Sequence, residues 1–327
     1  MYTKKNYSFW MTVNWSKKPF IIGFIYAGII SLLTYQFQLN LFLPWQPIGV
    51  IGIAVAFYLG FKNNSSYDRT WEARKIYGGI VNDSRSMGVG IVTFVQGANA
   101  QTIKKELIYR HIAWLTALRH QLRLSKPWEH IENRINGLYV PDVCEDYNNK
   151  LHHELCKYLS IEEVKELDTA TNKATQILKN QSERLQALKD QGYFEDFRHM
   201  ELHKQITNLY EGQGKAERIK NFPFPRQYAS TALWLTLVFC GLVPFGLLEM
   251  FSGGFLTQLF NPLIAGLIIW VFFLMEKIGD YSENPFEGTY NDVPITSISI
   301  AIEIDLREMI KDSDIPLPLE IENGFLM

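Results

Sequence analysis

Two groups of side chains in the sequence have the composition of a metal site. His199 and His203 lie four residues apart, so on a helix both imidazoles face the same side. Zinc sites use such ligands, but they need three or four of them, and no third candidate stands near this pair. The carboxylates of Glu283, Glu287 and Asp292 are too few and too scattered for the oxygen-rich cage that calcium requires. We therefore predict no metal site and no cofactor.

Signatures of enzyme active sites are absent from the sequence, including those of nucleotide-binding loops, metalloproteases, serine hydrolases and kinases. The adjacent glycines of GGIVNDSR (78–85) fall in a helical context with no preceding strand, which argues against a phosphate-binding loop. The three cysteines are odd in number and irregularly spaced, so we expect no disulfide framework and a reducing compartment for the polar residues. A net charge of −2 at pH 7 gives no reason to expect nucleic acid. We expect no enzyme and no catalytic residue.

The stretch from 47 to 61 has a different kind of pattern. Large apolar side chains recur every fourth residue and form a ridge: Ile53, Phe57 and Phe61. Small side chains form the adjacent stripe, which lets membrane helices approach closely: Gly52, Ala56 and Gly60. Copies of this helix could turn the ridge toward a shared water path, where apolar rings would control the passage of ions. The alternative is that the ridge contacts lipid or a neighbouring helix, as on any membrane helix.

The distribution of charge places this stretch in a membrane. No Asp, Glu, Lys or Arg occurs from 19 to 61, and Glu249 is the only one from 227 to 275. Each block is long enough for two membrane helices of about 20 residues. The connections 36–47 and 249–262 contain no Lys or Arg, so positive-inside counting puts both termini in the cytoplasm. The sequence therefore predicts a multi-pass protein of the cell membrane.

The predicted fold is all-α, with four transmembrane helices and a large helical cytoplasmic domain. Apolar residues at helical spacing recur through the polar middle of the chain, and no alternation typical of strands persists. Five segments follow in order: a cytoplasmic N-terminal arm (1–18), a first transmembrane hairpin (19–61), a helical cytoplasmic domain (62–226), a second transmembrane hairpin (227–275) and a cytoplasmic C-terminal segment (276–327). We expect a turn at 43–47, loops at 126–130 and 139–141, and a fourth membrane helix that starts at 255 or 262.

Several motifs together resemble the bacterial branch of the bestrophin ion channels. The resemblance covers nearly the whole chain, in family order: LGF (59–61) after Ile53 and Phe57, NNSSYDRTWEARKIYGGIVNDSR (63–85), ERIKNFPFPRQY (217–228) and ENPFEG (283–288). It implies a homopentamer with one axial pore, in which the second helix of each copy lines a narrow neck with Ile53, Phe57 and Phe61. It also implies a second, cytoplasmic constriction, which we expect near Phe197 and Met200.

The resemblance implies a passive channel whose partners are copies of itself, membrane lipid and permeant ions. The family at large implies chloride or another anion, and for a bacterial member a monovalent cation such as sodium is the alternative. Animal bestrophins follow Asn-Pro-Phe with an acidic run that binds calcium, but here only Glu287 and Asp292 follow Phe286, so we expect no calcium gating. A different class remains open: a membrane-anchored helical scaffold or signalling module without ion flux. A coupled transporter is disfavoured, because the predicted crossings hold no charge pair and no inverted repeat.

Overall fold

The computed structural model describes residues 1–129, 146–251 and 260–327. Among them the structure has no β-strand beyond two isolated bridges, which confirms the predicted all-α class. The helices are α1 (Phe9–Phe37), α2 (Trp45–Phe94), α3 (Ala100–Arg123), α5 (Tyr147–Leu155), α6 (Ile161–Asp168), α7 (Lys173–Asp190), α8 (Asp196–Asn221), α9 (Arg226–Leu248), α11 (Phe260–Ser282) and α12 (Ile295–Met309). The loop expected at 139–141 and a helix start at 255 lie outside the described residues.

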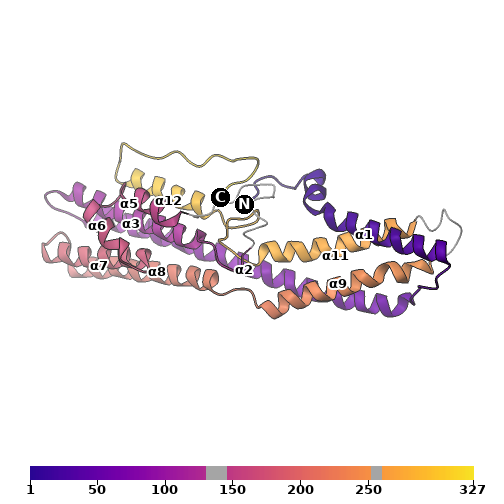
Figure 1. The fold of residues 1–327 in the computed structure, drawn as a ribbon. Coiled ribbons are helices and arrows are strands. Elements are labelled where there is room, and N and C mark those ends of the chain that lie inside the picture. Colours follow the sequence, from indigo (N-terminus) through magenta and orange to yellow (C-terminus); the bar gives the residue numbers. More distant parts are fainter. Residues whose placement is uncertain (130–145, 252–259) are drawn as a thin grey trace.

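Two helical bundles lie end to end and are joined by α2 (Figure 1). The first, which we call the membrane bundle, contains α1, the first half of α2, α9 and α11. Four helical stretches of the described chain are long and apolar enough to cross a membrane, and they supply these four helices. The second, the distal bundle, contains the other half of α2 with α3, α5 to α8 and α12. At 1.5 Å per residue, the 50 residues of α2 extend over about 75 Å, so one helix positions side chains in both bundles.

Helices α2 and α1 each contain a proline, and their limits differ from the predicted ones. The turn expected at 43–47 is shorter, because α2 already begins at Trp45 and includes Pro47 in its first turn. A proline is tolerated there since the first helical N–H groups have no partner within the helix. Helix α1 begins at Phe9, inside the expected N-terminal arm, and continues through Pro19.

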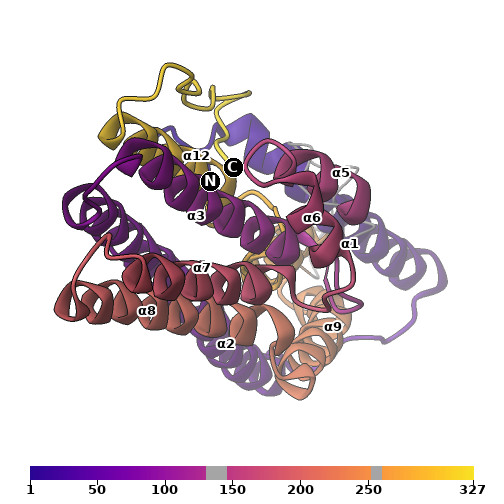
Figure 2. The same ribbon diagram turned by 90° about the vertical axis from the view of Figure 1, so that its left-hand side faces the viewer.

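The distal bundle has a dense apolar core. Helices α12, α3, α7 and α8 lie in successive layers (Figure 2), and α8 packs along α2. Trp114 of α3 is fully buried, and its indole N–H donates to Gln213 of α8 over 2.9 Å. His120 and Arg119 of α3 both pair with Glu154 of α5, and together these groups hold the pKa of that carboxyl down to about 2, although burial opposes them. These contacts join α3 to α8 and α5, and α8 in turn connects the distal bundle to α2.

His111 makes this core sensitive to acid. Its side chain is buried beside Trp114, and neither ring nitrogen has a hydrogen-bond partner among the described residues. Burial lowers the pKa of His111 from 6.5 to about 3. The unfolded chain therefore takes up a proton below pH 6.5 that the folded chain refuses, and stability is full above that pH and falls as the pH drops toward 3.

We expect the free energy of unfolding to fall by about 1.4 kcal/mol between about pH 7.5 and 5.5 on account of His111. His111→Leu should remove this part of the acid sensitivity, whereas His153→Leu, at an exposed position of α5, should keep it. Thermal unfolding followed by circular dichroism at the two pH values measures the difference. An identical pH dependence in the His111→Leu variant and the wild type would contradict the assignment.

Candidate ion pathway

The apolar ridge of α2 is exposed along its whole length. Ile53, Phe57 and Phe61 expose 73%, 69% and 60% of their surface, respectively. The opposite side of the same helix is buried in the membrane bundle, where Val55 and Leu59 expose 1% and 0%. The rings of Phe57 and Phe61 meet edge to face, with centroids 4.7 Å apart. One chain therefore presents a continuous apolar and aromatic surface that none of its described helices covers.

The three small residues beside the ridge have different environments. A Cβ atom on Gly52 would lie 2.6 Å from the ring of Phe239, so glycine at this position allows the close approach of α2 and α9 within one chain. A Cβ atom on Gly60 would meet nothing within 4 Å. Ala56 is half-buried between these two. Among the described residues, a neighbouring helix of the same chain therefore packs closely against the Gly52 end of the stripe and leaves the Gly60 end open.

A buried ion pair fixes α2 to α11 directly after the ridge. The Lys62 ammonium lies 2.8 Å from Glu276 and 3.8 Å from Asp280, and its side chain is only 1% exposed. Lys62 and Glu276 each stand one residue beyond a predicted crossing, so sequence reasoning did not pair them. A buried pair is costly to break, because the remaining charge is left without compensation. The pair therefore holds Phe61 in a fixed position relative to the membrane bundle.

The turn after α11, which contains the ENPFEG motif, closes around one carboxylate. Oδ1 of Asp292 accepts the backbone N–H groups of Phe286 and Val293 over 2.7 and 2.6 Å. Oδ2 accepts the N–H of Gly288 and the guanidinium of Arg123, both over 2.7 Å. Calcium would need six or more oxygen ligands, whereas donors surround Asp292. The residues present do not fit a calcium site.

Other contacts fix the same turn to the start of the third membrane helix. Glu283, which is completely buried, pairs with Arg226 over 3.0 Å, and Arg69 of α2 donates to the backbone oxygen of Glu283 over 2.9 Å. Arg69 also donates to the backbone oxygen of Phe222, just before α9. Three of the four motifs that suggested the resemblance (63–85, 217–228 and 283–288) therefore meet in space, at the junction of the two bundles.

The residues of the expected second constriction lie on the first turns of α8. Phe197 and Met200 expose 88% and 69% of their surface, so neither belongs to the core of the distal bundle. The neighbouring rings of His199 and His203 stack with centroids 6.2 Å apart, and Nδ1 of His203 lies 3.2 Å from the Ser182 hydroxyl. No group of three or more His, Cys, Asp or Glu side chains that could hold a metal occurs among the described residues.

The fold and the ridge define a class of protein: a multi-helix membrane protein whose second helix presents an uncovered aromatic surface. Residues 17–308 match the family model described as bacterial/fungal bestrophin protein. The chain therefore belongs to the bestrophin family, as its motifs suggested.

Relatives and solved structures agree with this assignment. The voltage-dependent anion channel-forming protein RSc3414 of Ralstonia nicotianae is 27% identical over 292 residues, which cover 89% of this chain and 85% of that protein. The voltage-dependent anion channel-forming protein YneE of Escherichia coli K12 is 26% identical and covers 90% and 87%. The crystal structure of a bacterial bestrophin homologue from Klebsiella pneumoniae superimposes with a TM-score of 0.76 at 22% identity, over 90% of this chain and 98% of that one.

Proposed function

We propose that this chain forms a passive ion channel in which α2 of each copy lines a narrow hydrophobic neck. The observation that carries the proposal is the ridge of Ile53, Phe57 and Phe61, which is exposed on a helix whose other side is buried. Relatives named as voltage-dependent anion channel-forming proteins support the same activity. We take the assembly to be a pentamer from the family resemblance, with an axis that the ridge faces.

In this channel the neck controls conduction by wetting. Rings of Ile and Phe at a narrow radius hold no stable water column, so an ion entering the neck loses hydration that the side chains cannot replace. A small rotation of α2 would change the radius and switch conduction. Phe rings present slightly positive edges and slightly negative faces, so their orientation favours one sign of ion over the other. We propose chloride as the permeant ion, with sodium as the competing choice.

The distal bundle would surround a cytoplasmic vestibule, with both termini on the cytoplasmic side. The lack of Lys and Arg in the connections 36–47 and 249–262 supports this topology. The exposed Phe197 and Met200 would form the second constriction, since side chains so open in one chain are available to face an axis. We keep the five segments with the limits expected from the sequence, and the pore helix is the second helix of the first transmembrane hairpin (19–61).

Ion flux into liposomes tests both the channel activity and the choice of permeant ion. Purified protein is reconstituted, and flux is followed first with chloride and then with sodium as the only permeant ion. We expect chloride flux well above that of protein-free liposomes and a smaller sodium flux. Sodium flux alone would keep the channel and reverse its selectivity. Flux of neither ion would favour the scaffold, whose crossings serve only as anchors.

A further inference from the structure

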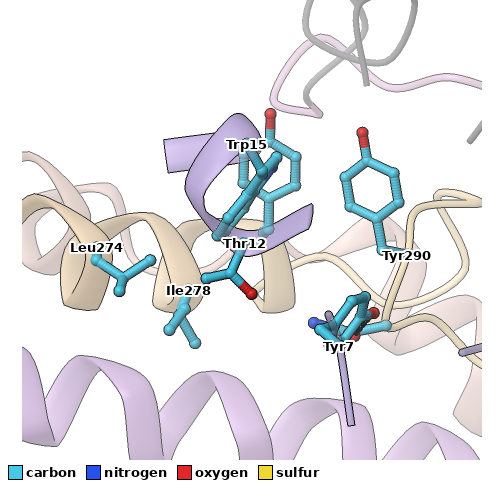
Figure 3. A pocket seen from close by; sticks show the side chains of 8 residues that line it. Tyr7, Thr12, Trp15, Leu274, Ile278 and Tyr290 are labelled. Carbon is cyan, nitrogen blue, oxygen red and sulfur yellow. Dashed lines mark hydrogen bonds between the residues drawn. The ribbon is translucent and has the colours of Figure 1, made fainter. Parts of the chain in front are cut away.

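A cavity of about 270 Å³ lies between the start of α1, the end of α11 and the turn that follows α11 (Figure 3). Its lining is aromatic and apolar, with few polar atoms: Tyr7, Thr12, Trp15, Leu274, Ile278, Tyr281, Tyr290 and Asn291. The Tyr7 hydroxyl donates to the Asn291 side chain over 3.0 Å, and this bond joins the N-terminal arm to the turn after α11. The cavity is distinct from the α2 ridge, because the residues that line it belong to the N-terminal arm, α1, α11 and the turn after α11.

The sequence fixes the depth of this cavity in the membrane. The charge-free stretch of α1 begins just after Lys18, and the charge-free stretch of α11 ends just before Glu276. Trp15 and Tyr281 stand beside these two limits, where aromatic side chains with a polar edge are typical of the membrane–water interface. Both helices therefore leave the hydrocarbon at the level of the cavity.

The Lys277 ammonium contacts the aromatic wall, and the exposed Lys18 follows Trp15 by three residues on α1. Pro19 has no N–H, so the backbone oxygen of Trp15 lacks its usual partner within the helix. The Lys277 ammonium donates to that oxygen over 2.7 Å and also lies 4.1 Å from the centroid of the Trp15 ring. The positive charge of Lys18 is close enough to repel the Lys277 ammonium, and the carboxylate of Asp280 attracts it. The cavity is thus apolar, and the positive charges of Lys277 and Lys18 lie near it together with the carboxylate of Asp280.

We propose that this cavity binds an anionic phospholipid of the cytoplasmic leaflet, one per chain. The glycerol end of an acyl chain would occupy the apolar part between Leu274, Ile278 and Trp15, and the phosphate would lie at Lys18 and Lys277. A basic residue near a membrane surface contributes roughly fivefold to binding of an anionic lipid. The inference uses the proposed topology but not ion conduction, so it can fail or succeed independently of the channel.

Native mass spectrometry of the whole assembly in detergent tests this site. The protein is titrated with phosphatidylglycerol or with phosphatidylcholine of the same acyl chains. We expect one retained phosphatidylglycerol per chain and a preference over phosphatidylcholine of about 25-fold, from two lysines at roughly fivefold each. Lys18→Gln should lower that preference roughly fivefold. Lys150→Gln, an equal charge change at an exposed position of α5, should leave it unchanged.

A second variant tests the cavity itself. Thr12→Trp adds a large side chain to the lining, so it should lower the retention of both lipids while the assembly keeps its mass. Equal retention of the two lipids by the wild type, or the same effect of Lys18→Gln and Lys150→Gln, would overturn the proposal. So would a wild-type assembly that retains no lipid, which would mean that a second copy or nothing fills the cavity.

Discussion

Replacing both Phe57 and Phe61 by alanine is expected to raise single-channel conductance in planar bilayers about tenfold, the equivalent of a barrier lower by about 1.4 kcal/mol. The two rings expose 69% and 60% of their surface in one chain, and no described side chain of that chain covers them. Their removal widens the proposed neck and lets a continuous water column form, so a passing ion keeps more of its hydration. Because the rings contribute little to the core, the fold should tolerate the change.

The matched control is Phe37→Ala, since Phe37 is 65% exposed at the end of α1, a helix that the proposal does not place at the neck. It removes an aromatic ring of similar exposure from the membrane bundle and should leave the conductance unchanged. Unchanged current in the double variant, at normal assembly size, would place Phe57 and Phe61 outside the pore. An equal rise in both variants would indicate a general loosening of the membrane bundle.

Helical period identified the ridge from sequence because its spacing survives without any tertiary information. The same reasoning could not say what covers it. Trp10 and Phe37 of α1 are as exposed as Phe57, so exposure within one chain does not separate a lipid-facing side chain from one that faces an axis. Whether a side chain faces lipid or an axis depends on contacts between copies. For the α2 ridge, the assignment to an axis came from the family resemblance.

The sequence also could not identify the side chain that packs against each small residue. Spacing placed Gly52 and Gly60 on one stripe, but the side chain that fills the space beside Gly52 is Phe239, nearly two hundred residues later. Helix α1 begins at Phe9 and passes through Pro19, and Lys277 of α11 donates to the Trp15 backbone oxygen that the proline leaves without its usual donor. Such compensation comes from another helix and leaves no local signal.

The sequence argued against a calcium site at Asp292 but did not indicate the partner of its carboxylate. A carboxylate after ENPFEG was weighed as a calcium ligand and rejected for lack of acidic neighbours. The structure gives a stronger reason, since Arg123 of α3 already supplies the positive charge. The two residues are 169 positions apart, and no spacing rule links them.

Asp292→Asn is therefore expected to destabilise the protein by about 3–5 kcal/mol. The side chains of Arg123 and Asp292 expose 0% and 1% of their surface, so loss of the carboxylate charge removes an ion pair of a fully buried guanidinium. One Asp292 oxygen would also become an amide N–H₂ facing donors, and the backbone N–H groups of the turn would lose an acceptor. The matched control is Asp305→Asn, which breaks a largely exposed pair with Arg85 and should cost no more than about 1 kcal/mol.

The double variant separates the charge pair from the turn. Arg123→Met alone leaves a buried carboxylate whose three backbone donors remain, so it should cost less than Asp292→Asn. If the two charges compensate each other, Arg123→Met combined with Asp292→Asn should cost less than the sum of the single changes, by about 1–3 kcal/mol. Thermal unfolding of the detergent-solubilised assembly measures all four proteins. Strict additivity would mean that Asp292 acts through the backbone of the turn alone, and an Asp292→Asn variant as stable as Asp305→Asn would show that the junction of the two bundles does not depend on this pair.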